Sequence, residues 1–420
     1  MSLTLRAAVD RTLIEHDQTS QRYLVLTMTA PGGTTSRLPV NLALVVDASG
    51  SMSGTKLARV KEAAGFALRQ LTGADRAAVI AYDDEVTVVA PSTLMTAEAK
   101  VELLSRLKGV QAGGMTNLGG GWLAGCQEVA RGQAGDGQMN RVIVLTDGLA
   151  NVGMTAPDKL VEHAHQLRLR GIVTSTMGIG ADFNEDLLEA LARHGGGRFH
   201  YVETARHIPD CIQGELGEML QVSARKVALE ITLPTGMRCS GCLNDYVLED
   251  TARGVRVHLG DLLASDTRHV VLELSITPQA DAGRLAIAAV ALYVDMATGR
   301  GADTTFPVLH VCHASGDAVA AQEADEAVSR QVALLLAAKA KDEAVRLSRL
   351  GEHAAAAATL AYARQSLSTS ADAGDGAVAG ELASLTHLAL QASTGFDEGQ
   401  RKELRYQSYL SREARTRYDQ

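Results

Sequence analysis

The sequence predicts an α/β domain with a mostly parallel central sheet and helices on both faces, inserted in an antiparallel β-sandwich and followed by an α-helical C-terminal region. Three patterns of apolar residues predict this arrangement. Short apolar runs alternate with helical patterns over residues 41–222, which is typical of repeated βα units. Apolar residues at every second position flank this stretch on both sides, and an Ala-rich helical pattern occupies residues 317–420.

Within the α/β stretch, strands are expected at 42–46, 76–82, 86–89, 142–146, 172–177 and 199–202. Helices are expected at 55–71, 97–107, from 118 onward, and at 159–170, 185–194 and 208–221. In the C-terminal region, helices are expected at 327–350, 353–367, 381–393 and 397–416.

The two flanks of the α/β stretch are predicted to belong together. In residues 1–40, Leu24, Leu26 and Met28 recur at every second position and so share one face of a strand. Residues 223–316 repeat this period in several short runs separated by turn signals, which favours an antiparallel sandwich. We infer that the first flank completes this sandwich, because the ends of an inserted domain can lie close together.

A polar turn follows the first strand of the α/β stretch. Asp47, Ser49 and Ser51 are spaced by small residues in Asp47-Ala-Ser-Gly-Ser51, just before a helical pattern. Such a turn lies at the carboxyl edge of a parallel sheet, where open α/β sheets bind ligands. One carboxylate and two hydroxyls, without sulfur or imidazole, form an oxygen donor set that suits Mg²⁺ better than Zn²⁺. The turn therefore predicts a magnesium site.

Two further motifs follow this D-x-S-x-S turn in order. Thr116 lies in Gly113-Gly-Met-Thr-Asn117, and Asp147 ends an apolar run and precedes Gly148. With these three motifs the sequence resembles the von Willebrand factor A (VWA) family, and its layout is similar to that of bacterial VWA proteins with flanking β segments. The resemblance implies a Rossmann-like domain with a metal-ion-dependent adhesion site (MIDAS).

The resemblance also implies a role for each residue of the site. Ser49 and Ser51 would ligate the metal through their hydroxyls. Asp47 and Asp147 would act largely through water molecules. Thr116 would ligate directly in one state and through water in another. The expected ion is Mg²⁺, with Mn²⁺ or Ca²⁺ as alternatives.

The function implied by the resemblance is protein binding without catalysis. Neutral hydroxyl ligands leave Mg²⁺ electrophilic, so it accepts an anionic oxygen such as the Asp or Glu carboxylate of a partner protein. An adaptor or assembly factor is expected. The resemblance leaves open whether the partner is an AAA-type ATPase or another multi-protein assembly, and whether the helix expected at 208–221 shifts when ligand binds.

Two other functions remain as alternatives. A scaffold whose metal is purely structural would carry the same residues. A metal-dependent hydrolase is less favoured, because Ser49 stands where phosphotransferases of the haloacid dehalogenase type carry the second Asp of D-x-D. The sequence also contains neither G-x-x-x-x-G-K-[ST] nor G-x-S-x-G. The acidic run Asp83-Asp-Glu85 predicts a solvated turn, with a second cation site as the alternative.

A zinc site in the sandwich is a separate hypothesis. Cys239 and Cys242 have zinc-knuckle spacing, and His310 and Cys312 follow later in the same predicted domain. Cysteine is also common as a small buried apolar residue. Whether these four residues bind zinc stays open at the level of sequence.

Composition limits the partners and the compartment. The net charge of −9, without a long basic block, argues against nucleic acid as the main partner. The longest apolar stretch, 285–294, is shorter than the roughly 20 residues that a membrane-spanning helix needs. No apolar core of signal-peptide length precedes residue 10, and the five cysteines are scattered rather than arranged as a disulfide framework. A cytoplasmic protein without a membrane span is expected.

Overall fold

The computed structural model describes residues 3–32, 37–133, 137–219, 221–244, 246–278, 283–296, 298–370 and 375–413. The chain divides into two compact units. One, here called the α/β unit, is the segment Thr35–Val222. The other, here called the sandwich unit, combines the segments Met1–Thr34 and Ser223–Thr416 on either side of it. The α/β unit is thus inserted in the chain of the sandwich unit.

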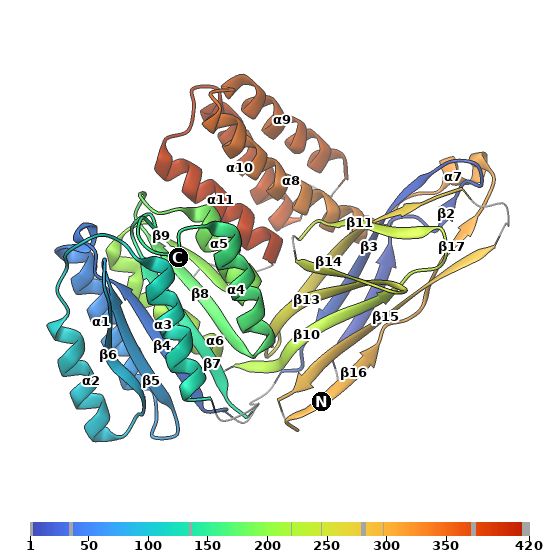
Figure 1. The fold of residues 1–420 in the computed structure, drawn as a ribbon. Helices are drawn as coiled ribbons and strands as arrows, with labels where there is room; N and C mark the ends of the chain where they lie inside the picture. The colour runs from blue at the N-terminus through green and yellow to red at the C-terminus, as the bar shows by residue number, and fades with distance from the viewer. Residues whose placement is uncertain are drawn as a thin grey trace. The chain divides into compact units, whose positions relative to one another are not determined.

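The α/β unit is built on a six-stranded sheet in the order β6-β5-β4-β7-β8-β9 (Figure 1). Its strands are β4 (Val40–Asp47), β5 (Arg76–Tyr82), β6 (Val86–Leu94), β7 (Met139–Thr146), β8 (Ile172–Ile179) and β9 (Gly196–Val202). Neighbouring strands are parallel except for the β5–β6 pair. The turn between β5 and β6 is too short for a crossover helix, so β6 can pair only in the antiparallel direction. The mostly parallel sheet confirms the predicted fold class.

Strand β6 is longer than the predicted 86–89, because it continues through Pro91 to Leu94. Proline removes a hydrogen-bond donor, so within sheets it is confined to edge strands, first residues of strands and bulges. β6 is the edge strand, so the proline does not end it.

Helices cover both faces of this sheet (Figure 1). They are α1 (Thr55–Gln70), α2 (Ala97–Gly109), α3 (Leu118–Arg131), α4 (Pro157–Leu169), α5 (Glu185–Gly195) and α6 (Ile208–Met219), with short 3₁₀ turns η1 (Gly50–Met52) and η2 (Ala205–His207). Helix α3 packs closely on the sheet because Gly125 has no side chain: a Cβ there would lie 2.4 Å from Cγ2 of Val45. The buried Trp122 on the same helix donates to Oγ1 of Thr174 at 3.1 Å.

The sandwich unit contains two further sheets. A four-stranded sheet has the order β1-β3-β14-β11, with β1 (Thr4–Val9), β3 (Ser20–Thr29), β14 (Thr267–Ile276) and β11 (Met237–Cys242). The second sheet has the order β12-β13-β10-β15-β17-β2, and β16 also pairs with β15. Its strands are β12 (Val247–Thr251), β13 (Gly254–Leu263), β10 (Val222–Thr232), β15 (Arg284–Asp295), β17 (Leu309–His313), β2 (Leu13–Ile14) and β16 (Arg300–Thr305).

The strands on the two sides of the insertion complete one sandwich. β3 pairs antiparallel with β14 along its whole length, from Ser20 opposite Ile276 to Thr29 opposite Thr267. Side chains from both sheets meet in one apolar core, for example Leu26 of β3 and Leu229 of β10. This arrangement confirms the predicted insertion of the α/β domain in a β-sandwich.

The C-terminal region is helical, as predicted. It comprises α7 (Gly316–Ala321), α8 (Glu326–Arg349), α9 (His353–Ser370), α10 (Gly376–Ala392) and α11 (Glu398–Glu413). Helix α8 packs on α9 and α11 and also on the four-stranded sheet, where Val328 and Val332 bury against Val25 and Val271. The last residues of the helix predicted at 397–416 lie outside the described residues. None of the helices in the described part of the chain is long and apolar enough to cross a membrane.

Candidate metal centre

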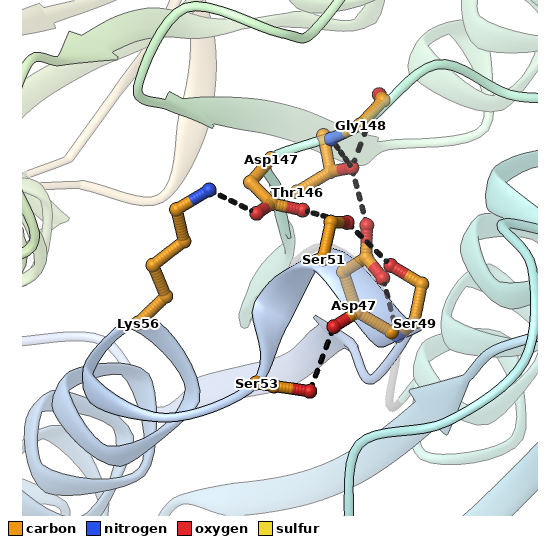
Figure 2. A network of polar contacts seen from close by, with 9 residues as sticks. Asp47, Ser49, Ser51, Ser53, Lys56, Thr146, Asp147 and Gly148 are labelled. Atoms are coloured by element: carbon orange, nitrogen blue, oxygen red, sulfur yellow. Dashed lines mark hydrogen bonds and ion pairs between the residues drawn. The ribbon is translucent and has the colours of Figure 1, made fainter.

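The two aspartates of the predicted site lie at the same edge of the α/β sheet. Asp47 ends β4 and Asp147 directly follows β7, and these two strands pair in parallel. The turn after β4 continues into η1, which keeps Ser49 and Ser51 beside the strand ends (Figure 2). Both aspartates are 0% exposed. Parallel pairing therefore brings together two carboxylates from distant parts of the chain.

Hydrogen bonds join four of the five predicted residues in one network (Figure 2). The backbone N–H of Ser49 donates to Oδ1 of Asp47 at 2.8 Å. The hydroxyl oxygens of Ser49 and Ser51 lie 3.2 Å apart. Ser51 Oγ donates to Oδ1 of Asp147 at 2.7 Å. The network thus runs from one aspartate to the other through the two serines.

The fifth residue, Thr116, reaches the same place from a loop. The loop is tied to the first turn by the N–H of Gly50, which donates to the carbonyl of Gly114 at 3.1 Å. A Cβ built on Gly148 would lie 3.4 Å from Oγ1 of Thr116 and 3.7 Å from Oγ of Ser51. The two hydroxyls therefore flank one small space beside a glycine. The structure brings all five predicted residues together, and their role as ligands stays a prediction.

The chemistry of this donor set fits a hard divalent cation. Burial raises the pKa of Asp47 above its ordinary value, although the hydrogen bonds from Ser49 and Thr146 act in the opposite direction. The nearby negative charge of Asp147 raises it further. A cation placed among these oxygens would favour the ionised form of Asp47. Carboxylates, hydroxyls and a space bounded by glycine are the features that an oxygen-coordinated ion needs.

Comparisons with known proteins identify the fold of this domain. Residues 41–213 match the von Willebrand factor type A domain model. These residues form a VWA domain. A solved von Willebrand factor type A structure from Catenulispora acidiphila superposes with a TM-score of 0.74, covering 97% of this chain and 96% of that one. The two share 17% sequence identity, so this likeness establishes the fold alone.

Two curated bacterial relatives are similar in sequence. The uncharacterized protein YfbK of Escherichia coli is 28% identical over 193 residues, and sll0103 of Synechocystis is 29% identical over 285 residues. These alignments cover 46% and 63% of this chain. They span only 33% and 66% of the relatives' own lengths.

Residues outside the predicted set also hold the VWA site together. Thr146 Oγ1 donates to Oδ2 of Asp47 at 2.6 Å, and Lys56 Nζ donates to Oδ2 of Asp147 at 2.5 Å (Figure 2). Asn151 accepts the N–H of Thr116 at 2.9 Å and so fixes the second loop. In the sequence, Thr146 and Lys56 are marked only by their closeness to the motifs. Thr146 directly precedes Asp147, and Lys56 follows the D-x-S-x-S turn.

The acidic run Asp83-Asp-Glu85 after β5 stabilises two neighbouring loops through hydrogen bonds. Oδ1 of Asp83 accepts the N–H of Glu85 at 2.8 Å and closes the turn. Oδ1 of Asp84 accepts the N–H of Met115 at 2.7 Å, next to Thr116. A Cβ on Gly114 would collide with the Asp84 carboxylate, which explains the glycine. The turn therefore positions the Thr116 loop of the VWA domain.

The four residues of the zinc hypothesis do not meet. Cys239 and Cys242 lie on β11, whereas His310 and Cys312 lie on β17 in the other sheet of the sandwich. Burial raises the pKa of the Cys242 thiol to about 12, which disfavours a thiolate ligand. Among the residues that the structure describes, no group of three or more His, Cys, Asp or Glu side chains could hold a metal ion. The zinc hypothesis required the two segments to pair, but β11 and β17 belong to different sheets.

Proposed function

We propose that this VWA protein binds Mg²⁺ at Asp47, Ser49, Ser51, Thr116 and Asp147 and through it captures an Asp or Glu side chain of a partner protein. The observation that supports this proposal is the hydrogen-bond network from Asp47 to Asp147, with Thr116 beside it at the carboxyl edge of the sheet. VWA domains are generally protein-interaction modules with such a site. The protein would then act as an adaptor or assembly factor.

Each residue has a distinct part in the proposed site. Ser49, Ser51 and Thr116 would offer neutral hydroxyl oxygens to the ion. Asp47 and Asp147 would supply the negative charge while their hydrogen bonds keep the serines in place. The bound metal would supply a Lewis-acidic position for an anionic oxygen. Neutral ligands leave more of its charge for the partner's carboxylate.

We also propose that the protein has no enzymatic activity and is located in the cytoplasm. In this proposal the hydroxyl oxygen of Ser51 ligates the metal while its proton is donated to Asp147, so Ser51 holds the ion rather than attacking a substrate. The five cysteines form no disulfide with one another, and Cys126 and Cys211 are buried. Cysteines kept as thiols suit a reducing compartment.

The test compares binding partners recovered from native lysate of the source organism. Wild type, Ser51→Ala and Thr116→Ala are used as bait in Mg²⁺ and in EDTA. Ser53→Ala is the matched control, because Ser53 lies in the same turn and its hydroxyl donates to the carbonyl of Gly50 at 2.7 Å. We expect one partner that binds to wild type and to Ser53→Ala in Mg²⁺ and is lost in every other arm.

The folded state of each bait is checked separately. Trp122 is the chain's only tryptophan and lies in the VWA domain, so its fluorescence reports on that domain. Equal recovery of every protein in all arms would overturn the proposal. Unfolding of the wild type in EDTA would instead identify the metal as purely structural.

A further inference from the structure

The two aspartates of the VWA site differ in their partners, because Lys56 forms an ion pair with Asp147. Lys56 lies in the first turn of α1, and its ammonium contacts Oδ2 of Asp147 at 2.5 Å (Figure 2). The Asp147 side chain is 0% exposed, whereas that of Lys56 is 31% exposed. Asp47, by contrast, accepts hydrogen bonds from the neutral groups of Ser49 and Thr146. One buried carboxylate therefore has a cation of the chain itself as its partner.

The position of this ammonium is set by the fold. A Cβ on Gly180, just after β8, would lie 3.9 Å from Nζ of Lys56. The lysine thus extends from α1 across the ends of the strands, and Ser51 occupies the other oxygen of Asp147. A buried carboxylate with a cation on one oxygen and a hydroxyl on the other is well compensated.

We propose that Lys56 is a built-in counter-cation of the metal site, which holds Asp147 in its binding position and weakens metal binding so that the ion stays exchangeable. This inference rests on the proposed function. The two carboxylates carry a charge of −2, and Lys56 reduces it to −1. A divalent cation is therefore attracted less strongly than it would be by the carboxylates alone, and it is repelled by the ammonium.

Whether the ion is exchangeable distinguishes an adhesive metal site from a structural one. A site that needs its metal in order to fold would bind it permanently, as structural sites do. A site whose carboxylate is already neutralised keeps its shape without the ion. Metal binding can then be coupled to capture of the partner rather than to folding. Lys56 therefore favours the adhesion role over the purely structural one.

The test uses four proteins: wild type, Lys56→Met, Lys56→Arg and Arg59→Met. Arg59 is the matched control, because it lies on the same helix and pairs with the exposed Glu62. Mn²⁺ alone is the probe, and free Mn²⁺ is counted by electron paramagnetic resonance. The melting temperature of each EDTA-treated protein is measured in parallel by fluorescence of Trp122.

We expect Lys56→Met to bind Mn²⁺ about tenfold more tightly than wild type, because a positive charge close to the ion is removed. The same variant should melt several degrees lower in EDTA, since Asp147 loses its partner. Lys56→Arg keeps the charge and should resemble wild type, and so should Arg59→Met. Opposite signs for metal affinity and metal-free stability distinguish a counter-cation from a residue that merely supports the fold.

Two results would contradict the inference. Unchanged or weaker Mn²⁺ binding by a folded Lys56→Met would overturn the counter-cation role and leave the metal site intact. A wild-type protein that does not bind Mn²⁺ at all would overturn the proposed function, and the inference with it.

Discussion

Thr146 donates a hydrogen bond of 2.6 Å to Oδ2 of Asp47, although the two residues are 99 positions apart in the chain. The contact exists because β4 and β7 pair in parallel, with Val46 opposite Leu145. Thr146 and Asp47 are both 0% exposed. The carboxylate of the D-x-S-x-S turn is therefore oriented by a residue of the neighbouring strand.

Replacing Thr146 with valine should destabilise the VWA domain. The substitution keeps the shape of the side chain but removes the hydroxyl donor from a buried carboxylate, which costs about 1–3 kcal/mol. Urea denaturation followed by fluorescence of Trp122 measures the effect. Thr146→Ser retains the hydroxyl and serves as the control. A valine variant as stable as wild type would show that this hydrogen bond contributes nothing.

Replacing Gly148 with alanine should impair metal binding and spare the fold. The new methyl group would lie at ordinary contact distance from the hydroxyls of Thr116 and Ser51, so the backbone can accept it. It would fill the space between these proposed ligands. We expect a loss of Mn²⁺ affinity of at least about tenfold, or about 1.4 kcal/mol. Gly73→Ala, in open surroundings of the same domain, should bind Mn²⁺ like wild type.

Asp75 should make the VWA domain sensitive to acid. It is 0% exposed, accepts the N–H of Val40 at 2.8 Å and pairs with Arg37. Burial alone would raise its pKa, but this ion pair and the surrounding hydrogen bonds outweigh burial and lower the pKa. Its contribution to stability is therefore complete above the unfolded pKa of about 4 and is lost as the pH falls through the folded pKa.

Asp75→Asn tests this dependence. The variant should be less stable than wild type at pH 7, by about 1–3 kcal/mol, and the difference should shrink on acidification. Denaturation midpoints between pH 7 and pH 3 provide the measurement. Asp182→Asn, at an exposed position, is the control. A stability difference that is constant with pH would contradict the assignment.

Asn244 should stabilise the sandwich unit without affecting the metal site. Its Oδ1 accepts the N–H of Val271, and its Nδ2 donates to the carbonyl of Arg412 in α11, both at 2.8 Å. Asn244→Ala should destabilise this unit by about 1–3 kcal/mol and release α11 to proteolysis. Asn244→Asp keeps the acceptor but places a carboxylate oxygen against the Arg412 carbonyl, so it should destabilise the unit as well. Mn²⁺ affinity should be unchanged in both variants; a change would show that the two units are coupled.

The sequence by itself determined the type of most elements and predicted the residues of the proposed site. Runs such as 42–46 and 142–146 are apolar throughout because both faces of a parallel strand are buried, so local pattern is enough to identify them. Asp47, Ser49 and Ser51 were found because their spacing within one turn is itself the signal. Thr116 and Asp147 were predicted from the resemblance to the VWA family, which implies a threonine in a second loop and an aspartate after a later strand.

Only the tertiary structure decided which distant groups meet. The hydrogen bond of Thr146 to Asp47 depends on strand order and register, which no local pattern encodes. The ion pair of Lys56 with Asp147 depends on the path of α1 across the sheet edge. For the same reason Cys239 and His310 share a predicted domain yet lie in different sheets. Which residues contact one another is a long-range property, because it is set by how whole strands and helices pack together.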